Sequence, residues 1–297
     1  MEKLPTIAIA NLSLFPVGRS GWSRPIIDTV VTAQAYGYNG IEWHPTTAST
    51  TSLSYMDPCD KLPGVLSVHQ SFLNLHPNAA RTPAKYATDE LLRHVMPDTR
   101  ESLQHIRYAA PRLVPGTVGV FYPCTESHFT TEQTGIHNRA SQPAPTAAFA
   151  LGLSDDAPVA AYVAAASEHG LPLLAPDTFH VRGFTEPQTY WEHIFTQYPD
   201  RVAEIHVSAG RTDMRTHAGE DTAKHTYDDL RGLLGGSAAL ARTYLGDQLA
   251  TAATHMRGNI PNLVVEISPL ALPRVGQLNQ RRAHRAITDT LREFWNS

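Results

Sequence analysis

The sequence predicts a single (β/α)₈ barrel over residues 1–297. Two observations lead to this prediction: short runs rich in β-branched residues alternate with segments of helical periodicity, and eight such runs occur along the chain. Strands that alternate with helices form a parallel sheet joined by crossover connections. Eight strands favour closure into a barrel, and barrels of this length commonly form one domain.

The expected elements cover most of the chain. Strands are expected at residues 6–13, 38–43, 64–72, 116–122, 146–153, 171–175, 202–207 and 263–267. Helices are expected at residues 26–33, 89–110, 158–169 and 279–294. Gly37 and Gly170 follow the first and third helices, and Pro97 should break or kink the second. Residues 123–145 are rich in Thr, Ser, Gln, Asn and Pro, which indicates mostly loop.

Composition narrows the classes of function. The net charge of −4 disfavours a protein that holds nucleic acid by charge. The two cysteines, Cys59 and Cys124, lack the CxxC spacing of a metal or redox motif and are expected as free thiols in a reducing compartment. No apolar run approaches the ~18–20 residues that cross a bilayer. We therefore expect a cytoplasmic protein with a small-molecule substrate and neither a nucleic-acid nor a membrane partner; a homodimer is compatible with the sequence.

Carboxylates and histidines gather where the expected strands end. In such a barrel, the carboxyl ends of the strands line the mouth of the active site. Carboxylate and imidazole ligands together suit Zn²⁺, Mn²⁺, Fe²⁺ or Co²⁺. The residues in question are Glu42, His69, Asp177, His180, His206 and Glu266.

Each of these residues also has a purely structural interpretation. Glu42 could be an exposed carboxylate at a strand end, and His69 a hydrogen-bonded core histidine. Asp177 could cap the segment that follows it. Glu266 lies among Val264, Val265 and Ile267, where a charge is costly unless it is paired or bound to metal. Their coincidence at strand ends favours a site.

Five motifs in order resemble the xylose-isomerase-like barrels, the superfamily of sugar phosphate isomerases, epimerases and endonuclease IV. They are GYNGIEWHP (37–45), SVHQSF (67–72), APDTFHVRG (175–183), RVAEIHVSAGR (201–211) and LVVEIS (263–268). The resemblance spans nearly the whole chain. Each motif is short, so the set indicates the superfamily and not the substrate.

The resemblance implies a divalent-metal site, with Mn, Zn, Fe, Co or Mg as the ion. It assigns metal binding to Asp177, His206 and Glu266, and to His180 as a further ligand or a substrate contact. It assigns acid–base catalysis to Glu266. Glu42, at the end of the second expected strand, is our second candidate for this role, and His180 would orient the substrate. It assigns substrate contacts to His69, Arg211 and His217.

Two departures from the family pattern bear on this site. The family places a metal-binding Glu at the end of the fifth strand, where this sequence has Gly152, with Asp155 and Asp156 just after it. One of these aspartates could substitute, the carboxylate could be absent, or His69 could serve instead. The fourth strand ends in FYPC, without the His that endonuclease IV requires. That difference and the net charge together argue against DNA repair.

The expected activity is a metal-dependent isomerase or epimerase that moves a proton at the carbon next to a metal-polarised carbonyl of a small sugar-like substrate. One alternative is a lyase, or an iron-dependent oxidative enzyme acting on a peptide or natural product. Another is a barrel without metal that has a binding role. Both alternatives remain open on the sequence, because fold does not determine function.

Overall fold

The structure is a computed structural model, and most of the expected strands lie in the part of the chain that it describes. It describes residues 4–14, 26–43, 63–69, 117–121, 148–153, 157–168, 173–178, 181, 184–207, 239–256, 261–266 and 277–297. The helix expected at 89–110 and the loop expected at 123–145 lie outside the described residues.

Eight strands form the sheet. They are β1 (Thr6–Ala10), β2 (Gly40–Trp43), β3 (Val65–His69), β4 (Val118–Phe121), β5 (Ala148–Gly152), β6 (Leu173–Ala175), β7 (Glu204–Val207) and β8 (Asn262–Val265). All the ladders are parallel, in the order β6-β5-β4-β3-β2-β1-β8-β7. Seven strands lie within the predicted ranges, and β8 begins one residue early. The expected first strand is shorter than predicted, because Asn11–Ser13 form a 3₁₀ turn, η1.

The two ends of the sheet lie next to each other. Isolated parallel bridges join Leu174 to Val202 and Asp177 to His206. The His206 N–H donates to the Pro176 carbonyl at 2.9 Å, and the Ala203 N–H donates to that of Leu174 at 3.0 Å. Among the described residues, no continuous ladder joins β6 to β7. Within the described ranges, the parallel α/β sheet therefore fits the expected barrel, and isolated bridges link its two ends.

The register divides the sheet into two faces with different chemistry. Ile7, Ile41 and Ile205 belong to the outward face, and they pack fully buried in the main hydrophobic core with the helices. Paired residues of parallel strands share a face, so the pairs Ala10↔Glu42 and Glu42↔Ser67 place these three residues together on the inner face. The inner face therefore combines small and polar side chains.

An irregularity between β2 and β3 sets the inner face of β3. Ile41 pairs with Val65, yet the next residue, Glu42, pairs with Ser67, so β3 has one extra residue at this point. An extra residue in one strand changes which face the following side chains occupy. As a result, Ser67 lies beside Glu42, and His69, two residues further, shares its face.

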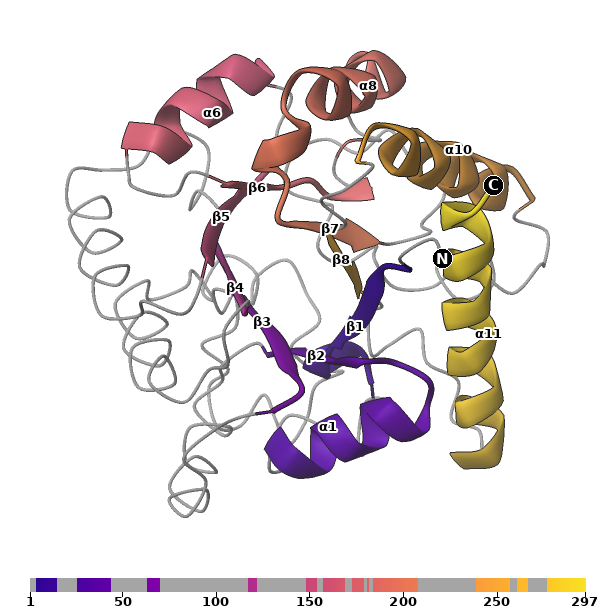
Figure 1. The fold of residues 1–297 in the computed structure, drawn as a ribbon. Coiled ribbons are helices and arrows are strands. Elements are labelled where there is room, and N and C mark those ends of the chain that lie inside the picture. The colour runs from indigo at the N-terminus through magenta and orange to yellow at the C-terminus, as the bar shows by residue number, and fades with distance from the viewer. Residues whose placement is uncertain are drawn as a thin grey trace, which may run out of the picture.

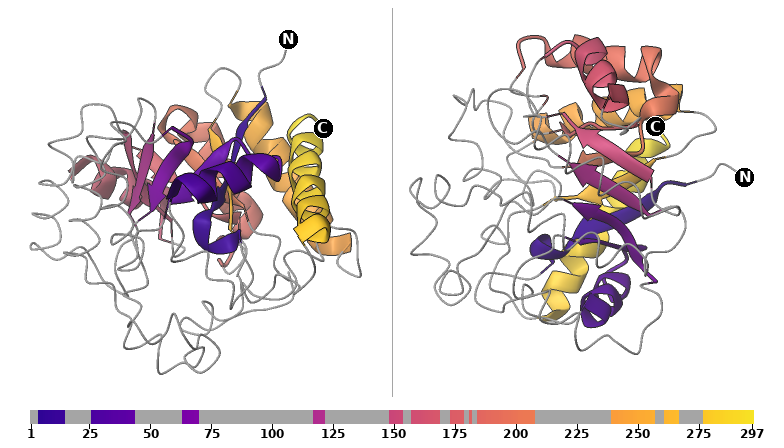
Figure 2. Two further views of the ribbon diagram at one scale, coloured as in Figure 1. Left: turned by 90° about the horizontal axis from the view of Figure 1, so that it is seen from below. Right: turned by 90° about the vertical axis from the view of Figure 1, so that its left-hand side faces the viewer.

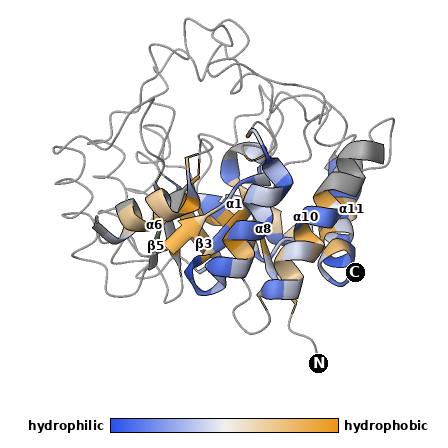
Figure 3. Ribbon diagram, turned by 90° about the horizontal axis from the view of Figure 1, so that it is seen from above, coloured by the Kyte–Doolittle hydropathy of each residue, from blue (hydrophilic) through white to orange (hydrophobic). Residues whose placement is uncertain are grey.

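In the part of the chain that the structure describes, five α-helices lie outside the sheet (Figure 1). They are α1 (Ile26–Ala35), α6 (Val159–Glu168), α8 (Pro187–Gln197), α10 (Ala239–His255) and α11 (Gln277–Trp295). Strand β5 and much of α6 are hydrophobic, whereas α8 and α10 carry both hydrophilic and hydrophobic residues (Figure 3). This distribution is what a sheet covered by helices requires, because its strands are buried on both faces.

The sequence analysis missed α8 and α10. Helix α8 begins with Pro187, a residue that suits the first turn of a helix, but its apolar face rests mainly on Trp191, Ile194 and Phe195 among polar residues. Helix α10 mixes Ala, Thr and Gly with few large apolar residues. It packs against both α8 and α11, and it lies beside α11 in both further views (Figure 2). Tertiary packing therefore stabilises helices whose sequence periodicity is weak.

None of the helices in the described ranges is long and apolar enough to cross a membrane.

A buried histidine on α11 should make the fold sensitive to acid. His284 is 1% exposed, its Nδ1 lies 2.9 Å from the Tyr38 hydroxyl, and its ring stacks on Tyr36. Burial lowers the pKa of His284 from 6.5 to about 4. Between these values the unfolded chain binds a proton that the folded chain excludes. Stability is therefore retained above pH 6.5 and declines as the pH falls towards 4, by up to about 3 kcal/mol from this group.

The test compares the wild type with His284→Gln, which stays neutral and can still accept the Tyr38 hydroxyl hydrogen. Urea unfolding of both proteins at about pH 7 and about pH 4.5 measures the loss of stability on acidification. We expect a smaller loss in the variant. Equal losses in both proteins would show that His284 does not contribute to acid sensitivity.

Candidate metal centre

Polar side chains from four strands meet inside the sheet around His206. We call Glu42, Ser67, His69, Glu204, His206 and Glu266 the inner polar cluster. The side chains of the first five are fully buried, and that of Glu266 is 20% exposed. Glu266 directly follows β8, and its N–H donates to the Val207 carbonyl at 3.0 Å, which places it beside the end of β7.

One side of the His206 ring faces two buried carboxylates. Its Nε2 lies 2.9 Å from Glu204 Oε1 and 3.3 Å from Glu42 Oε2. The Ser67 hydroxyl donates to Glu42 Oε2 at 2.9 Å. Glu42 is therefore held by β3 from one side and lies against His206 on the other.

The other side of the ring faces the partly exposed carboxylate. His206 Nδ1 lies 3.5 Å from Glu266 Oε1. The ring of His69 lies 5.4 Å from that of His206, centroid to centroid, and is tilted by 40°. His69, His206 and Glu266 form a group whose ligand atoms all lie within 4.8 Å of one another, and Glu42, Glu204 and His206 form a second such group.

Asp177 is fully buried and sits next to this cluster. It follows β6, and its backbone bridges to that of His206. Its charge is close enough to raise the pKa of Glu266. Among the described residues, the two groups of ligand atoms within 4.8 Å do not include Asp177.

Burial and repulsion between neighbouring carboxylates raise the pKa values of Glu204 and Glu266. Burial raises the pKa of Glu266 to about 8; His206 opposes this change, and Glu42, Asp177 and Glu204 add to it. Burial likewise raises the pKa of Glu204 to about 7, against the hydrogen bond from His206. Burial alone would lower the pKa of His206, but Glu42, Glu266 and Glu204 raise it well above its ordinary value.

The donor set fits a divalent cation. Glu42, Glu204 and Glu266 surround His206, and the raised pKa values of Glu204 and Glu266 indicate that His206 alone does not compensate their negative charges. Two atoms bound to one ion at ~2.1 Å are at most about 4.2 Å apart, so atoms within 4.8 Å need only small movements to share an ion. Glu204 Oε2 is buried and makes no hydrogen bond within the described part of the chain. Carboxylate oxygens and imidazole nitrogens are ligands that Mn²⁺, Fe²⁺, Co²⁺ and Zn²⁺ accept.

Several residues singled out from the sequence cannot be placed. His180, Arg211 and His217 lie outside the described residues, as do Asp155 and Asp156. Gly152 ends β5 and pairs with Ala175 of β6, so this strand end has no side chain to offer. Of the carboxylates and histidines predicted at strand ends, the structure brings Glu42, His69, His206 and Glu266 together.

The sequence analysis missed Glu204. A strand places residues two apart on one face, so a carboxylate two positions before His206 in an otherwise apolar strand shares its face. That spacing was the available signal. The predicted ligands all stand at the carboxyl ends of strands, whereas Glu204 is the first residue of β7.

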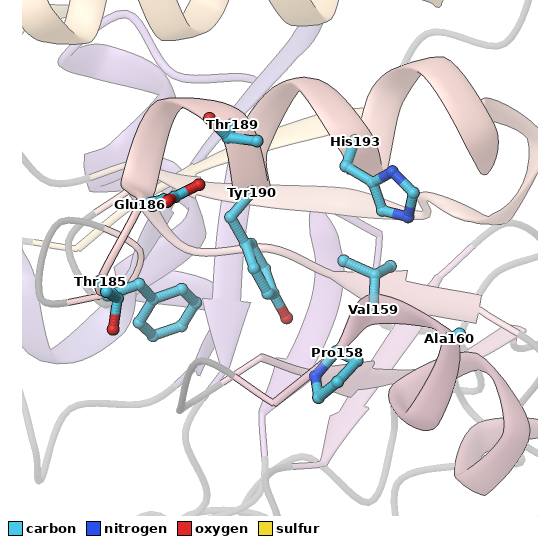
Figure 4. Close-up of a pocket in the computed structure, with 9 residues that line it drawn as sticks. Pro158, Val159, Ala160, Thr185, Glu186, Thr189, Tyr190 and His193 are labelled. Atoms are coloured by element: carbon cyan, nitrogen blue, oxygen red, sulfur yellow. The ribbon is translucent and has the colours of Figure 1, made fainter.

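A separate hollow of about 450 Å³ lies between the beginnings of α6 and α8. Figure 4 shows Tyr190 extending from α8 towards Pro158, just before α6. The Tyr190 hydroxyl donates to the Ala157 carbonyl at 2.9 Å, and its ring packs edge-on against Phe184. No member of the inner polar cluster lines this hollow, so it is not part of the candidate metal centre.

Comparison with known proteins finds a likeness among solved structures. No protein-family model matches the chain, and no curated protein matches it. Among solved structures, the chain is similar to a xylose isomerase domain protein from Alicyclobacillus acidocaldarius subsp. acidocaldarius, with 10% sequence identity and a TM-score of 0.48. The match covers 92% of this chain and 95% of the other. At this identity and TM-score, the likeness transfers no activity to this chain.

Proposed function

We propose that the chain is a divalent-metal-dependent isomerase or epimerase of a small sugar-like or hydroxy-carbonyl substrate, built as one closed (β/α)₈ barrel. The observation that supports the metal site is the inner polar cluster, in which three carboxylates surround one buried imidazole. A divalent cation would offset the charge that His206 alone leaves uncompensated. The reaction class follows from the resemblance of the sequence motifs.

The proposed ligands are Glu266, His206 and His69, and Asp177 is a further candidate because its backbone bridges to that of His206. When bound, the ion would supply Lewis-acid polarisation of substrate oxygens. The chain would orient the substrate with residues of the cluster and would exclude water from the deeper, fully buried carboxylates.

Glu266 is the proposed acid–base residue. Its side chain is 20% exposed, whereas that of Glu42 is fully buried, so Glu266 can meet a substrate proton and Glu42 cannot without rearrangement. Burial and the neighbouring carboxylates raise the pKa of Glu266 to about 8. A carboxyl group on the open side of the site can both accept and return a proton, which is what epimerisation requires.

The reaction is tested by proton exchange with solvent. The protein, purified without chelator and supplied with Mn²⁺, is incubated in D₂O with a panel of ketoses and hydroxy-ketones. We expect deuterium at the carbon next to the carbonyl, detected by NMR or mass spectrometry, because the proton on Glu266 would exchange with D₂O. Deuterium incorporation that is equal with and without protein across the panel would contradict the proposal.

Metal binding is expected to stabilise the fold. A ligand at about 100 times its Kd adds about 2.7 kcal/mol to the free energy of unfolding, which for a chain of this size corresponds to roughly 5 °C in Tm. Metal-free protein is titrated with Mn²⁺ and Zn²⁺ while Tm is followed. Glu192→Gln, which removes an exposed carboxylate on α8, is the control and should show the same shift as the wild type. An unchanged Tm together with no metal retained would count against the site.

A specific observation also favours the iron-dependent oxidative alternative. His69, His206 and Glu266 are two histidines and one carboxylate, the ligand set of many non-haem Fe(II) oxygenases. Anaerobic loading with Fe²⁺, followed by exposure to air, separates the two proposals. Oxygen consumption that depends on a candidate substrate would favour oxidation, whereas exchange of a substrate proton in the presence of redox-inert Zn²⁺ would favour the isomerase.

A further inference from the structure

The ring of His206 has a closed side and an open side. Nε2 faces Glu204 and Glu42, both fully buried, while Nδ1 faces Glu266, which reaches solvent. A buried imidazole that bonds through one nitrogen presents the other nitrogen to a ligand. The side on which the proton is held therefore decides which nitrogen can bind a metal ion.

We propose that Glu204 is the positioning residue of this site: its carboxylate holds the proton of His206 on Nε2 and so presents Nδ1 as the metal-binding nitrogen. The inference rests on the metal site of the proposed function. Metal-bound histidines commonly donate their second ring N–H to a carboxylate or carbonyl, which sets the orientation of the ring and raises its basicity.

Three observations favour Glu204 over Glu42 in this role. The Glu204 contact with Nε2 is the shorter one, 2.9 Å against 3.3 Å. Glu42 Oε2, the atom that faces Nε2, already accepts the Ser67 hydroxyl. Glu204 also lies two residues before His206 on the same strand, so the backbone of β7 sets the spacing between the two side chains.

The geometry also indicates why Nδ1 is the nitrogen that can take the ion. Glu266 Oε1 lies 3.5 Å from Nδ1 of His206, and the imidazole of His69 lies nearby. A cation bound at Nδ1 would therefore find two further ligands on this side of the ring. A cation at Nε2 would have to displace a hydrogen bond between fully buried groups. The closed side thus serves as support for the ring, and the open side serves as the ligand face.

The test uses Zn²⁺ as the probe and ¹⁵N NMR of the full chain, in which long-range couplings identify the protonated nitrogen of His206. Glu204→Leu keeps a similar volume and removes the acceptor. Glu204→Gln keeps an oxygen that can accept the hydrogen bond. Glu192→Gln again serves as the surface control.

In the wild type we expect Zn²⁺ on Nδ1 and a proton on Nε2. Glu204→Leu should weaken Zn²⁺ binding by about 10–100-fold, the usual effect of removing such a supporting contact. Glu204→Gln should recover at least part of this loss, whereas a merely structural carboxylate would give equal losses in both variants. Zn²⁺ on Nε2, or unchanged affinity in Glu204→Leu, would overturn the proposal.

A metal-free measurement separates this inference from the proposed function. Without metal, the Nε2–H proton of His206 should give a downfield NMR resonance that is protected from exchange with solvent. Glu204→Leu should shift this resonance upfield and increase its exchange rate, whereas Glu192→Gln should leave both unchanged. If the wild type binds no Zn²⁺, the metal-dependent function fails while this resonance still decides the role of Glu204. A resonance that is identical in Glu204→Leu would overturn the positioning role.

Discussion

Glu266→Gln is expected to remove most of the catalysed proton exchange while leaving the fold intact. The substitution keeps the shape of the side chain but removes the group that accepts the proton. A positioned general base contributes about 10²–10⁴-fold to a rate, so the rate of deuterium incorporation should fall by that factor. The loss of an anionic ligand should also weaken metal binding.

Stability should change little in this variant or should increase. Burial, together with repulsion from Glu42, Asp177 and Glu204, outweighs the attraction of His206 and favours the neutral form of Glu266 in the metal-free protein, so a neutral isostere should not destabilise the fold. Tm, bound metal and exchange rate are measured on one preparation, with Glu192→Gln as the control. A variant that loses several kcal/mol of stability, but keeps its metal and its rate in the folded fraction, would identify Glu266 as a structural ion-pair partner.

Trp191→Ala is expected to cause the largest loss of stability among the changes considered. Trp191 lies on α8, is fully buried, and packs against Phe195 with ring centroids 4.9 Å apart. Its Nε1–H donates to the Gln248 carbonyl on α10 at 2.8 Å. Truncation of such a side chain typically costs about 3–5 kcal/mol, because the cavity that it leaves closes only in part.

Trp191→Phe is the matched control. It retains an aromatic ring in the core and removes the hydrogen bond. We expect the lost hydrogen bond to lower the free energy of unfolding by about 1 kcal/mol, and the smaller cavity to lower it somewhat further. Urea unfolding measures both variants. If Trp191→Ala costs no more than Trp191→Phe, the contact between α8 and α10 does not depend on filling this volume.

How far the fold could be predicted depends on the strength of each local pattern. Strands such as β1 and β8 are continuous runs of apolar and β-branched residues, and buried parallel strands have this appearance in sequence. Helix α10 lacks a strong apolar stripe and packs against α8 and α11, whereas the buried face of α8 consists of Trp191, Ile194 and Phe195 among polar residues. Local propensity could not reveal α10, because the partners that stabilise it lie at both lower and higher sequence numbers.

The candidate site shows the same division. His206, Glu266 and Asp177 could be selected from the sequence because they stand at strand ends, where a parallel sheet gathers its side chains. Glu204 was missed, although its spacing from His206 already placed both residues on one face. The chain alone therefore specified the kinds of ligand and the edge of the sheet where they gather.

Tertiary structure decided which of these atoms meet. The extra residue in β3 turns Ser67 towards Glu42, and the alignment of β8 with β7 brings Glu266 to Nδ1 of His206. A shift of one residue in either pairing would move these side chains to the other face or to another level of the sheet. The residue pattern of a strand can be read from that strand alone, whereas register depends on contacts between strands far apart in the chain. For that reason only the folded structure could show that Nε2 of His206 faces buried carboxylates and Nδ1 faces Glu266.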